Sequence, residues 1–370
     1  MLNPESQTFA RLRLACVLIA LPLLRCTVSG ESFTTPTSGE TQAGAGPLSA
    51  GAASIGDHVG GTGAGGGPAT AGAASSAAGA GGSDEGDAGS AGRGGSGSSP
   101  ACTGKPGTLR GKSDQMLTAA GLERTFIYYA PPNLDPNVPA PVVIVAHGWT
   151  MSGQQMYDIT RYHQLADSEG FVLMYPDGQP AAIGPWNVGQ DACPSSFAVL
   201  PNATGDDQAF IDAMLDFAEA DQCLAHEHVF VTGFSMGGYF ANETGCMRRD
   251  VAAIAPHSGG SHDFGGCANE RKPVILFHGT ADIVIPLTCG NEARDRWVQR
   301  NGCGTAVDSV DVLGGHCEYS KDCPEGGQVA LCLFDGMGHG WAGGAEASFS
   351  YPEVEPAAQL AWQFFKEHAW

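Results

Sequence analysis

Short, almost entirely apolar segments alternate with amphipathic segments from residue 141 to the end of the chain. The apolar segments are rich in Val, Ile and Phe and have the length of strands, and a strand that is covered on both faces has this composition. They are residues 141–147, 171–176, 228–233, 251–256, 273–278 and 328–334. Helical patterning occurs in residues 154–170, 206–220, 237–247 and 355–369. Strands and helices in alternation predict an α/β domain with a mainly parallel central sheet flanked by helices.

The N-terminal residues have the layout of a targeting segment. Residues 11–24, RLRLACVLIALPLL, place two arginines before an apolar run that is short for a membrane span. We therefore interpret residues 1–30 as an export signal, with a short membrane anchor as the alternative. Cleavage near Ser29 or Gly30 is one expectation, and lipidation of Cys26 as a lipoprotein anchor is the other.

A second segment, residues 31–100, consists mostly of glycine, alanine and serine. Such a segment cannot bury enough apolar surface to offset the loss of chain entropy, so we expect a disordered tether. It lacks a strict G-x-y period, which excludes collagen. Residues 101–370 are then expected to form one globular domain.

The cysteine content indicates the compartment of the protein, and the net charge excludes some classes of partner. The chain has 12 cysteines and a formal net charge of −21, and ten of the cysteines lie in residues 101–370. An even number behind an export signal predicts disulfide bonds formed in an oxidising compartment. No C-x-x-C pair occurs, so we expect no metal site. The negative charge argues against nucleic acid and anionic membranes as partners.

One serine lies between glycines at the end of a predicted strand, in VTGFSMGG at residues 231–238. A strand, then G-x-S-x-G, then a helix is the arrangement of a nucleophile elbow, whose tight turn exposes the serine hydroxyl above the sheet. Gly233 and Gly237 are expected to be small because neighbouring elements press against them. The following helix N-terminus favours developing negative charge. We therefore predict that Ser235 is a nucleophile.

A serine nucleophile needs a base, and the base needs an orienting acid. In this architecture the chain order is Ser, acid, His, with each residue in a loop after a strand. That order selects His339 in DGMGHGW as the base and Asp282 in HGTADIVIP as the acid. His147 and His278 also end predicted strands, and we interpret them as packing and loop-shaping residues.

Acyl transfer also requires donors for the oxyanion of the tetrahedral intermediate. The first donor expected is the backbone N–H of Met236, which follows the nucleophile. The second is the N–H of Trp149, with Gly148 as the neighbouring alternative. Trp149 is also expected to line the substrate cleft, and a half-buried aromatic residue without substrate contact is the equal alternative.

With these residues identified, residues 102–367 resemble secreted serine esterases of the polyhydroxybutyrate depolymerase and feruloyl esterase group, which are similar to carbohydrate esterase family 1. The resemblance rests on separate motifs: HGWT (147–150), YPDG (175–178), WNVG (186–189), DDQAFI (206–211), GFSMGG (233–238), HGTADIVIP (278–286) and GHGWAGG (338–344). It implies an α/β-hydrolase fold, an ester substrate, no cofactor, and the same nucleophile, acid and base.

Two features qualify the resemblance. Trp341 is followed by Ala342, where the group commonly has proline, and we expect Trp341 to contribute to a wall of the substrate cleft. Asp177 and Asp207 lie in the recurring YPDG and DDQAF segments, so the resemblance suggests structural roles for them.

The resemblance also suggests two disulfide bonds. One would join Cys223 to Cys246 and the other Cys303 to Cys323. The sequence by itself does not fix the connectivity of ten cysteines.

We therefore expect an exported serine carboxylic ester hydrolase that acts through an acyl-enzyme intermediate, secreted or associated with the cell envelope. Feruloyl or acetyl esters of plant polysaccharide are the favoured substrates. A poly(3-hydroxybutyrate) depolymerase is the alternative, and we expect such an enzyme to carry an adsorption module, which does not follow the predicted domain. A serine peptidase and a catalytically inactive binding protein are further alternatives.

Overall fold

The computed structural model describes residues 102–179, 184–188, 193, 205–262, 266–268 and 270–370. These residues belong to one compact unit, Gly89–Trp370. The predicted export signal, the lipidation of Cys26 and the tether lie outside the described residues.

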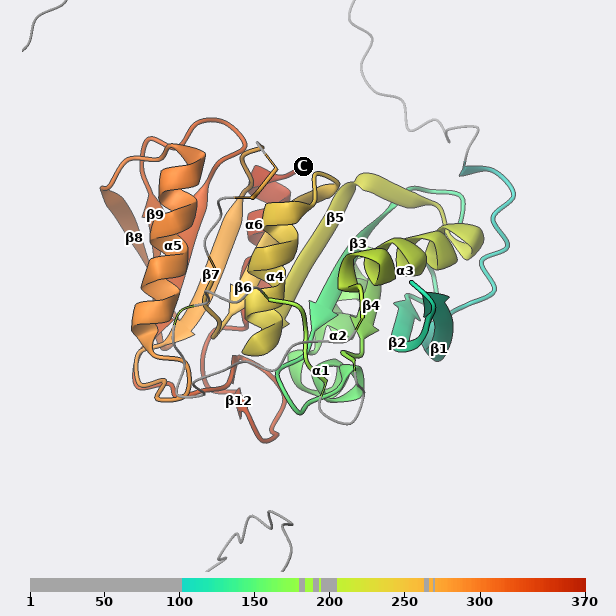
Figure 1. Cartoon of the computed structure of the whole chain (residues 1–370), viewed down its shortest axis with the longest axis horizontal. Coiled ribbons are helices and arrows are strands. Elements are labelled where there is room, and N and C mark those ends of the chain that lie inside the picture. Colours follow the sequence, from blue (N-terminus) through green and yellow to red (C-terminus); the bar gives the residue numbers. More distant parts are fainter. Residues whose placement is uncertain (1–101, 180–183, 189–192, 194–204, 263–265, 269) are drawn as a thin grey trace, which may run out of the picture. The chain divides into compact units, whose positions relative to one another are not determined.

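A ten-stranded sheet runs through the described part of the chain (Figure 1). Its order is β1 (Gly111–Ala119), β2 (Leu122–Ala130), β4 (Val172–Pro176), β3 (Ala140–Ala146), β5 (Leu224–Phe234), β6 (Val251–His257), β7 (Val274–Gly279), β10 (Val329–Phe334), β9 (Gly315–Ser320) and β8 (Val307–Val312). The pairs from β4 to β10 are parallel. The hairpins β1–β2 and β8–β9 extend the two edges antiparallel. The predicted mainly parallel sheet is thus confirmed.

Helices cover both faces of the sheet, and each face has its own hydrophobic core. The helices are α1 (Gly153–Thr160), α2 (Tyr162–Glu169), α3 (Asp207–Asp221), α4 (Met236–Met247), α5 (Leu287–Asn301) and α6 (Ala357–His368). Phe210, Phe240 and Trp297 of α3, α4 and α5 belong to one core. Tyr162 and Phe365 of α2 and α6 belong to the other. Figure 1 shows α3, α4 and α5 on the near face of the sheet.

The helix expected over residues 154–170 is wrong in one respect, because α1 ends and α2 begins at Arg161. This residue has the left-handed φ of 58°. The carbonyl of Ile159 accepts the backbone N–H of Ala345, at 2.9 Å, instead of continuing the helix. A contact with a distant loop therefore divides a segment whose local pattern is helical.

Several elements have no clear apolar pattern in the sequence. The strands β1 and β8 carry alternating or exposed residues, and α5 is mostly polar outside one stripe. That stripe includes the buried residues Cys289, Ala293 and Trp297, spaced four apart. A short pair of strands, β11 (Trp341–Ala342) and β12 (Ser350–Tyr351), follows the loop of His339.

Five disulfide bonds occur in the described residues, and they correct one prediction. Cys303 and Cys323 are joined, as predicted. The predicted Cys223–Cys246 bond is wrong, because Cys223 pairs with Cys102 and Cys246 with Cys267. Backbone hydrogen bonds bring these partners together, for instance from the N–H of Ala268 to the carbonyl of Cys246 at 3.0 Å. The remaining bonds are Cys193–Cys289 and Cys317–Cys332.

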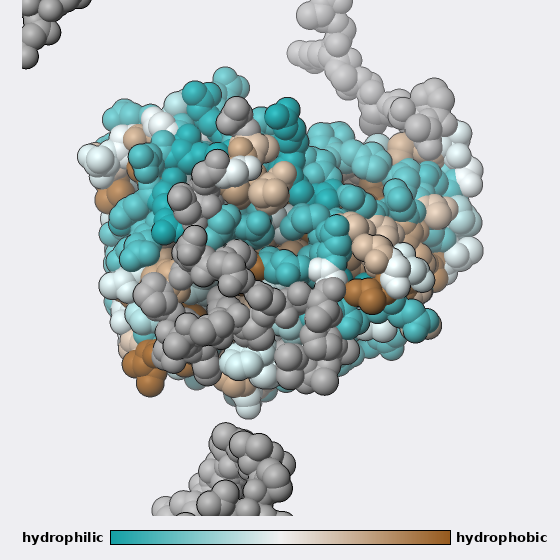
Figure 2. Space-filling view, viewed as in Figure 1, coloured by the Kyte–Doolittle hydropathy of each residue, from teal (hydrophilic) through white to brown (hydrophobic). Residues whose placement is uncertain are grey.

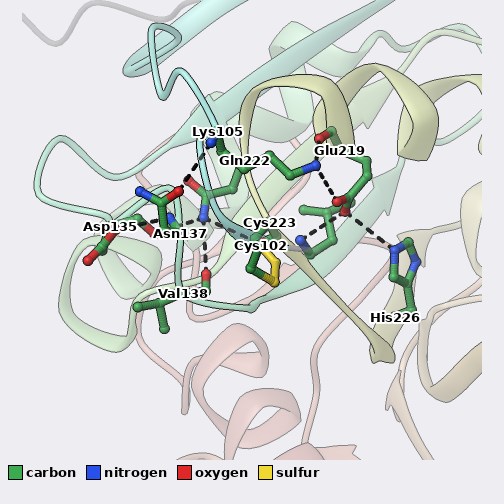
Figure 3. The surroundings of a disulfide bond; sticks show 10 residues. Cys102, Lys105, Asp135, Asn137, Val138, Glu219, Gln222, Cys223 and His226 are labelled. Carbon is green, nitrogen blue, oxygen red and sulfur yellow. Dashed lines mark hydrogen bonds and ion pairs between the residues drawn. A yellow bond between two sulfur atoms is a disulfide. The ribbon is translucent and has the colours of Figure 1, made fainter. Parts of the chain in front are cut away.

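The Cys102–Cys223 bond fixes the start of the described domain to the start of β5 (Figure 3). Beside it, the amide of Gln222 donates to the carbonyls of Asp135 at 3.0 Å and Val138 at 3.2 Å. The disulfide and these bonds hold three separate segments at the end of the sheet opposite Ser235.

Hydrophilic residues dominate the face shown in Figure 2, where hydrophobic residues form small, separated patches. Within the residues described, no helix has the length and apolar character needed to cross a bilayer.

Candidate active site

Ser235 occupies a strained turn between β5 and α4. Its φ and ψ angles are 57° and −117°, and such a conformation costs a non-glycine residue about 1–3 kcal/mol. Its backbone N–H donates to the carbonyl of His257 at 2.9 Å. A Cβ atom on Gly237 would overlap the carbonyl oxygen of Ala146, and one on Gly233 would overlap the carbonyl oxygen of Gly237. The small residues are therefore required by close backbone approach, as predicted.

Asp282 and His339 lie in the loops after β7 and β10, and they are hydrogen-bonded. Nδ1 of His339 is 2.7 Å from Oδ2 of Asp282. The other carboxylate oxygen, Oδ1, accepts the backbone N–H groups of Val284 and Ile285, both at 2.9 Å. The aspartate side chain is fully buried and the histidine side chain is 9% exposed. This arrangement fixes the imidazole and favours the tautomer that leaves Nε2 free to accept a proton.

A phenylalanine brings His339 to the serine turn. The ring of Phe234, the residue before Ser235, lies 4.7 Å from the ring of His339, centroid to centroid. Phe234 is buried, so its position is fixed by the core. The three residues of the predicted triad thus each follow a parallel strand, at the carboxyl-terminal edge of the sheet.

The loop that follows β3 lies against the serine turn. A Cβ atom on Gly148 would lie 3.2 Å from Cβ of Ser235. The indole Nε1 of Trp186 donates to the carbonyl of His147 at 2.8 Å and holds this loop. Trp149 is half-buried and packs against the core. Gly148 and the first turn of α4 therefore border the serine from two sides.

Two other histidines that end strands, His147 and His278, form structural hydrogen bonds through ring nitrogens. In His147, Nδ1 is 2.8 Å from the carbonyl of Gly148, and Nε2 accepts the N–H of Gly178 at 3.0 Å. In His278, Nε2 donates to the carbonyl of Ile285 at 2.9 Å. Burial lowers the pKa of both imidazoles. These contacts agree with the loop-shaping roles expected for both residues.

His257 is a residue at this site that the sequence analysis did not single out. Its Nε2 accepts the backbone N–H of Ala342 at 3.0 Å, and its Nδ1 is 3.0 Å from Oγ of Ser258. The ring stacks against Trp341 with centroids 4.7 Å apart. Burial, followed by the neighbouring His278 and His339, lowers the pKa of His257 well below its ordinary value. The feature of the sequence that could have identified His257 is its position at the end of a predicted parallel strand.

Trp341 does not lie where its predicted substrate contact requires. It is 1% exposed, and its ring packs between His257 and Tyr162. The residue therefore supports the base loop from the core side, and its burial does not support a role as a wall of the cleft.

The two aspartates set aside in the sequence analysis have structural partners. Asp177 accepts the N–H of Gly153 at 2.8 Å and the hydroxyl of Thr125 at 2.8 Å. Asp207 forms a buried ion pair with Arg124 at 2.9 Å. In the described residues, no group of three or more His, Cys, Asp or Glu side chains is arranged to hold a metal ion.

Comparison with known proteins identifies relatives of this chain. The model of the Dienelactone hydrolase family matches residues 128–300. Feruloyl esterase D of Neurospora crassa is 29% identical over 63% of this chain and 80% of that protein. Feruloyl esterase C of Emericella nidulans is 30% identical over 72% of this chain and 91% of that protein. Among solved structures, an acetyl xylan esterase from Aspergillus awamori covers 69% of this chain and 99% of its own, with 18% identity and a TM-score of 0.49.

Proposed function

We propose a mechanism and a substrate class for this chain. The chain belongs to the feruloyl esterase family, and it is a serine carboxylic ester hydrolase. Ser235 is the nucleophile, His339 the general base and Asp282 the residue that orients the base. The observation that carries this assignment is the 2.7 Å bond between His339 and Asp282 beside the strained Ser235 turn. The mechanism uses no cofactor.

In the first half of the reaction, Nε2 of His339 takes the hydroxyl proton while Oγ of Ser235 attacks the ester carbonyl carbon. The resulting oxyanion accepts hydrogen bonds from the backbone N–H groups of Met236 and Trp149. Each such donor contributes about 2.7–4 kcal/mol to transition-state stabilisation. The bond to the alcohol oxygen then breaks, His339 protonates that oxygen, and the alcohol leaves an acyl-serine.

In the second half, water gives a proton to His339 and attacks the acyl carbonyl carbon. The bond between Oγ of Ser235 and the acyl carbon breaks, Ser235 regains its proton from His339, and the free acid leaves. Asp282 stabilises the imidazolium that forms in both halves, and the side chain of Trp149 lines the cleft beside the acyl group.

The substrates are feruloyl or acetyl esters on plant polysaccharide, and the protein works outside the cell or attached to the envelope. The names of the relatives support the ester class, since they include feruloyl esterases and a bifunctional acetylxylan esterase/xylanase of Neocallimastix patriciarum. The disulfide bonds support an oxidising compartment, and the N-terminal apolar segment supports export.

The test compares hydrolysis of p-nitrophenyl acetate, methyl ferulate and a hydroxybutyrate oligomer by the wild type and Ser235→Ala. We expect methyl ferulate to be the best substrate, and Ser235→Ala to lower kcat by about 10⁴-fold or more. Ser168→Ala is the matched control, because Ser168 lies exposed on α2 and its hydroxyl donates to the carbonyl of Leu165 in the same helix. Equal activity of wild type and Ser235→Ala would refute the nucleophile. Preference for the hydroxybutyrate oligomer would leave the proposed triad standing and refute the proposed substrate class.

A further inference from the structure

Phe349 has two properties that packing does not account for. It is 52% exposed, and its φ of 60° lies in the left-handed region that aromatic residues rarely adopt. An exposed apolar ring gains little from burial, and a strained backbone costs stability. When a strained residue occurs at a functional site, the strain is often part of the function.

The position of Phe349 is fixed against the loop of the proposed base. Its carbonyl accepts the backbone N–H of Trp341 at 2.8 Å. A Cβ atom on Gly340, the residue after His339, would lie 3.1 Å from the carbonyl carbon of Phe349. The side chain lies over Phe234, with ring centroids 6.5 Å apart. Because the ring of Phe234 also contacts His339, a single buried ring separates the exposed phenylalanine from the base.

The chemistry of the ester decides which half of the substrate meets this side of the site. His339 must reach the alcohol oxygen of the ester to protonate it. The carbonyl oxygen, which becomes the oxyanion, is held on the side of Gly148 and α4. Groups around His339 therefore border the leaving alcohol. In a polysaccharide ester that alcohol is a sugar, whose C–H face packs against the apolar face of an aromatic ring.

We propose that Phe349 is a specificity-determining residue that binds the sugar of the leaving alcohol, an inference that rests on the proposed function. The exposed ring provides an apolar platform beside His339, and the β11–β12 pairing holds that platform in place. The acyl group, feruloyl or acetyl, does not depend on this contact.

The experiment uses two esters that share an acyl group and differ in the alcohol. These are methyl ferulate and an arabinoxylan oligosaccharide that carries one ferulate ester, with p-nitrophenyl acetate as a third substrate. For Phe349→Ala we expect kcat/KM on the oligosaccharide ester to fall about tenfold, as loss of one aromatic contact implies. We expect kcat/KM on methyl ferulate and p-nitrophenyl acetate to change by less than about twofold.

Two further substitutions separate ring chemistry from folding. Phe349→Tyr keeps the ring and should retain the preference for the sugar ester, whereas Phe349→Leu keeps much of the volume and should lose it. Trp370→Ala is the control for an exposed aromatic residue, since Trp370 is 61% exposed and stacks on His228 of β5. His228 lies in the first half of β5, whereas Ser235 follows the end of that strand, so removal of Trp370 should not change the preference.

Each other outcome overturns the inference. An equal fall for both ferulate esters with p-nitrophenyl acetate unchanged would place Phe349 on the acyl side. An equal fall for all three substrates would make its role structural, and no change in Phe349→Ala and Phe349→Leu would give it no role. A wild type that cleaves none of the esters would instead refute the proposed function.

Discussion

Ser235 donates its backbone N–H to the carbonyl oxygen of His257 at 2.9 Å. The imidazole of the same histidine accepts the N–H of Ala342, three residues after His339. His257 therefore connects the strained serine turn to the loop that carries the proposed base. A displacement of about 1 Å in such an arrangement can cost about 10²-fold in rate.

Replacement of His257 tests this connection. His257→Phe keeps an aromatic ring, of slightly larger size, but leaves the N–H of Ala342 without its acceptor. We expect kcat to fall about 10- to 100-fold, with KM less affected, and the free energy of unfolding to fall by about 1–3 kcal/mol. Steady-state kinetics and urea unfolding measure the two effects separately.

His257→Gln is the control for that experiment, because its amide oxygen can accept the same N–H. Partial recovery of kcat in this variant would support a positioning role. Full activity in His257→Phe would show that the bond to Ala342 does not position the base.

Stability should fall in mild acid because three buried histidines are neutral in the folded protein. Burial lowers the pKa values of His147, His257 and His278 below 6.5, so between pH 6.5 and the lowered values the unfolded chain binds more protons. The free energy of unfolding that depends on these neutral imidazoles is fully present above pH 6.5. It decreases as the pH falls below 6.5, by up to about 1.4 kcal/mol per pH unit for each histidine. Urea unfolding at pH 7.5, 6.5 and 5.5 measures it, and equal free energies of unfolding would contradict it.

Removal of one partner from the buried ion pair of Arg124 and Asp207 should strongly destabilise the protein. Both side chains are 1% exposed, so Arg124→Met leaves a buried carboxylate without its partner. We expect a loss of about 3–5 kcal/mol in the free energy of unfolding, measured by urea titration. Arg124→Met combined with Asp207→Leu should recover part of that loss. A double variant that is less stable than Arg124→Met alone would contradict this account.

The turn itself should not tolerate a methyl group at Gly237. Gly237→Ala forces a Cβ atom into the carbonyl of Ala146, and we expect a loss of at least about 1–3 kcal/mol of stability together with most of the activity. The control is Gly266→Ala, where a Cβ atom meets no heavy atom within 4 Å. Thermal unfolding and hydrolysis of p-nitrophenyl acetate measure both effects. If the two variants behave alike, close approach is not the reason for glycine at residue 237.

The sequence by itself determined the alternation of strands and helices, the parallel centre of the sheet and the places of Ser235, Asp282 and His339. These features depend on local patterns: strands buried on both faces are apolar throughout, and a tight turn needs glycine where backbones meet. The hairpins β1–β2 and β8–β9 had no such pattern, because edge strands expose one or both faces.

Only the tertiary structure decided which distant residues become neighbours. It paired Cys223 with Cys102 and placed Trp341 in the core. It also joined His257 to both the serine turn and the base loop, and set Phe349 beside that loop. The physical reason is that a local pattern records which face of an element is buried. The partner across that face is chosen by the packing and hydrogen bonding of segments far away in the chain.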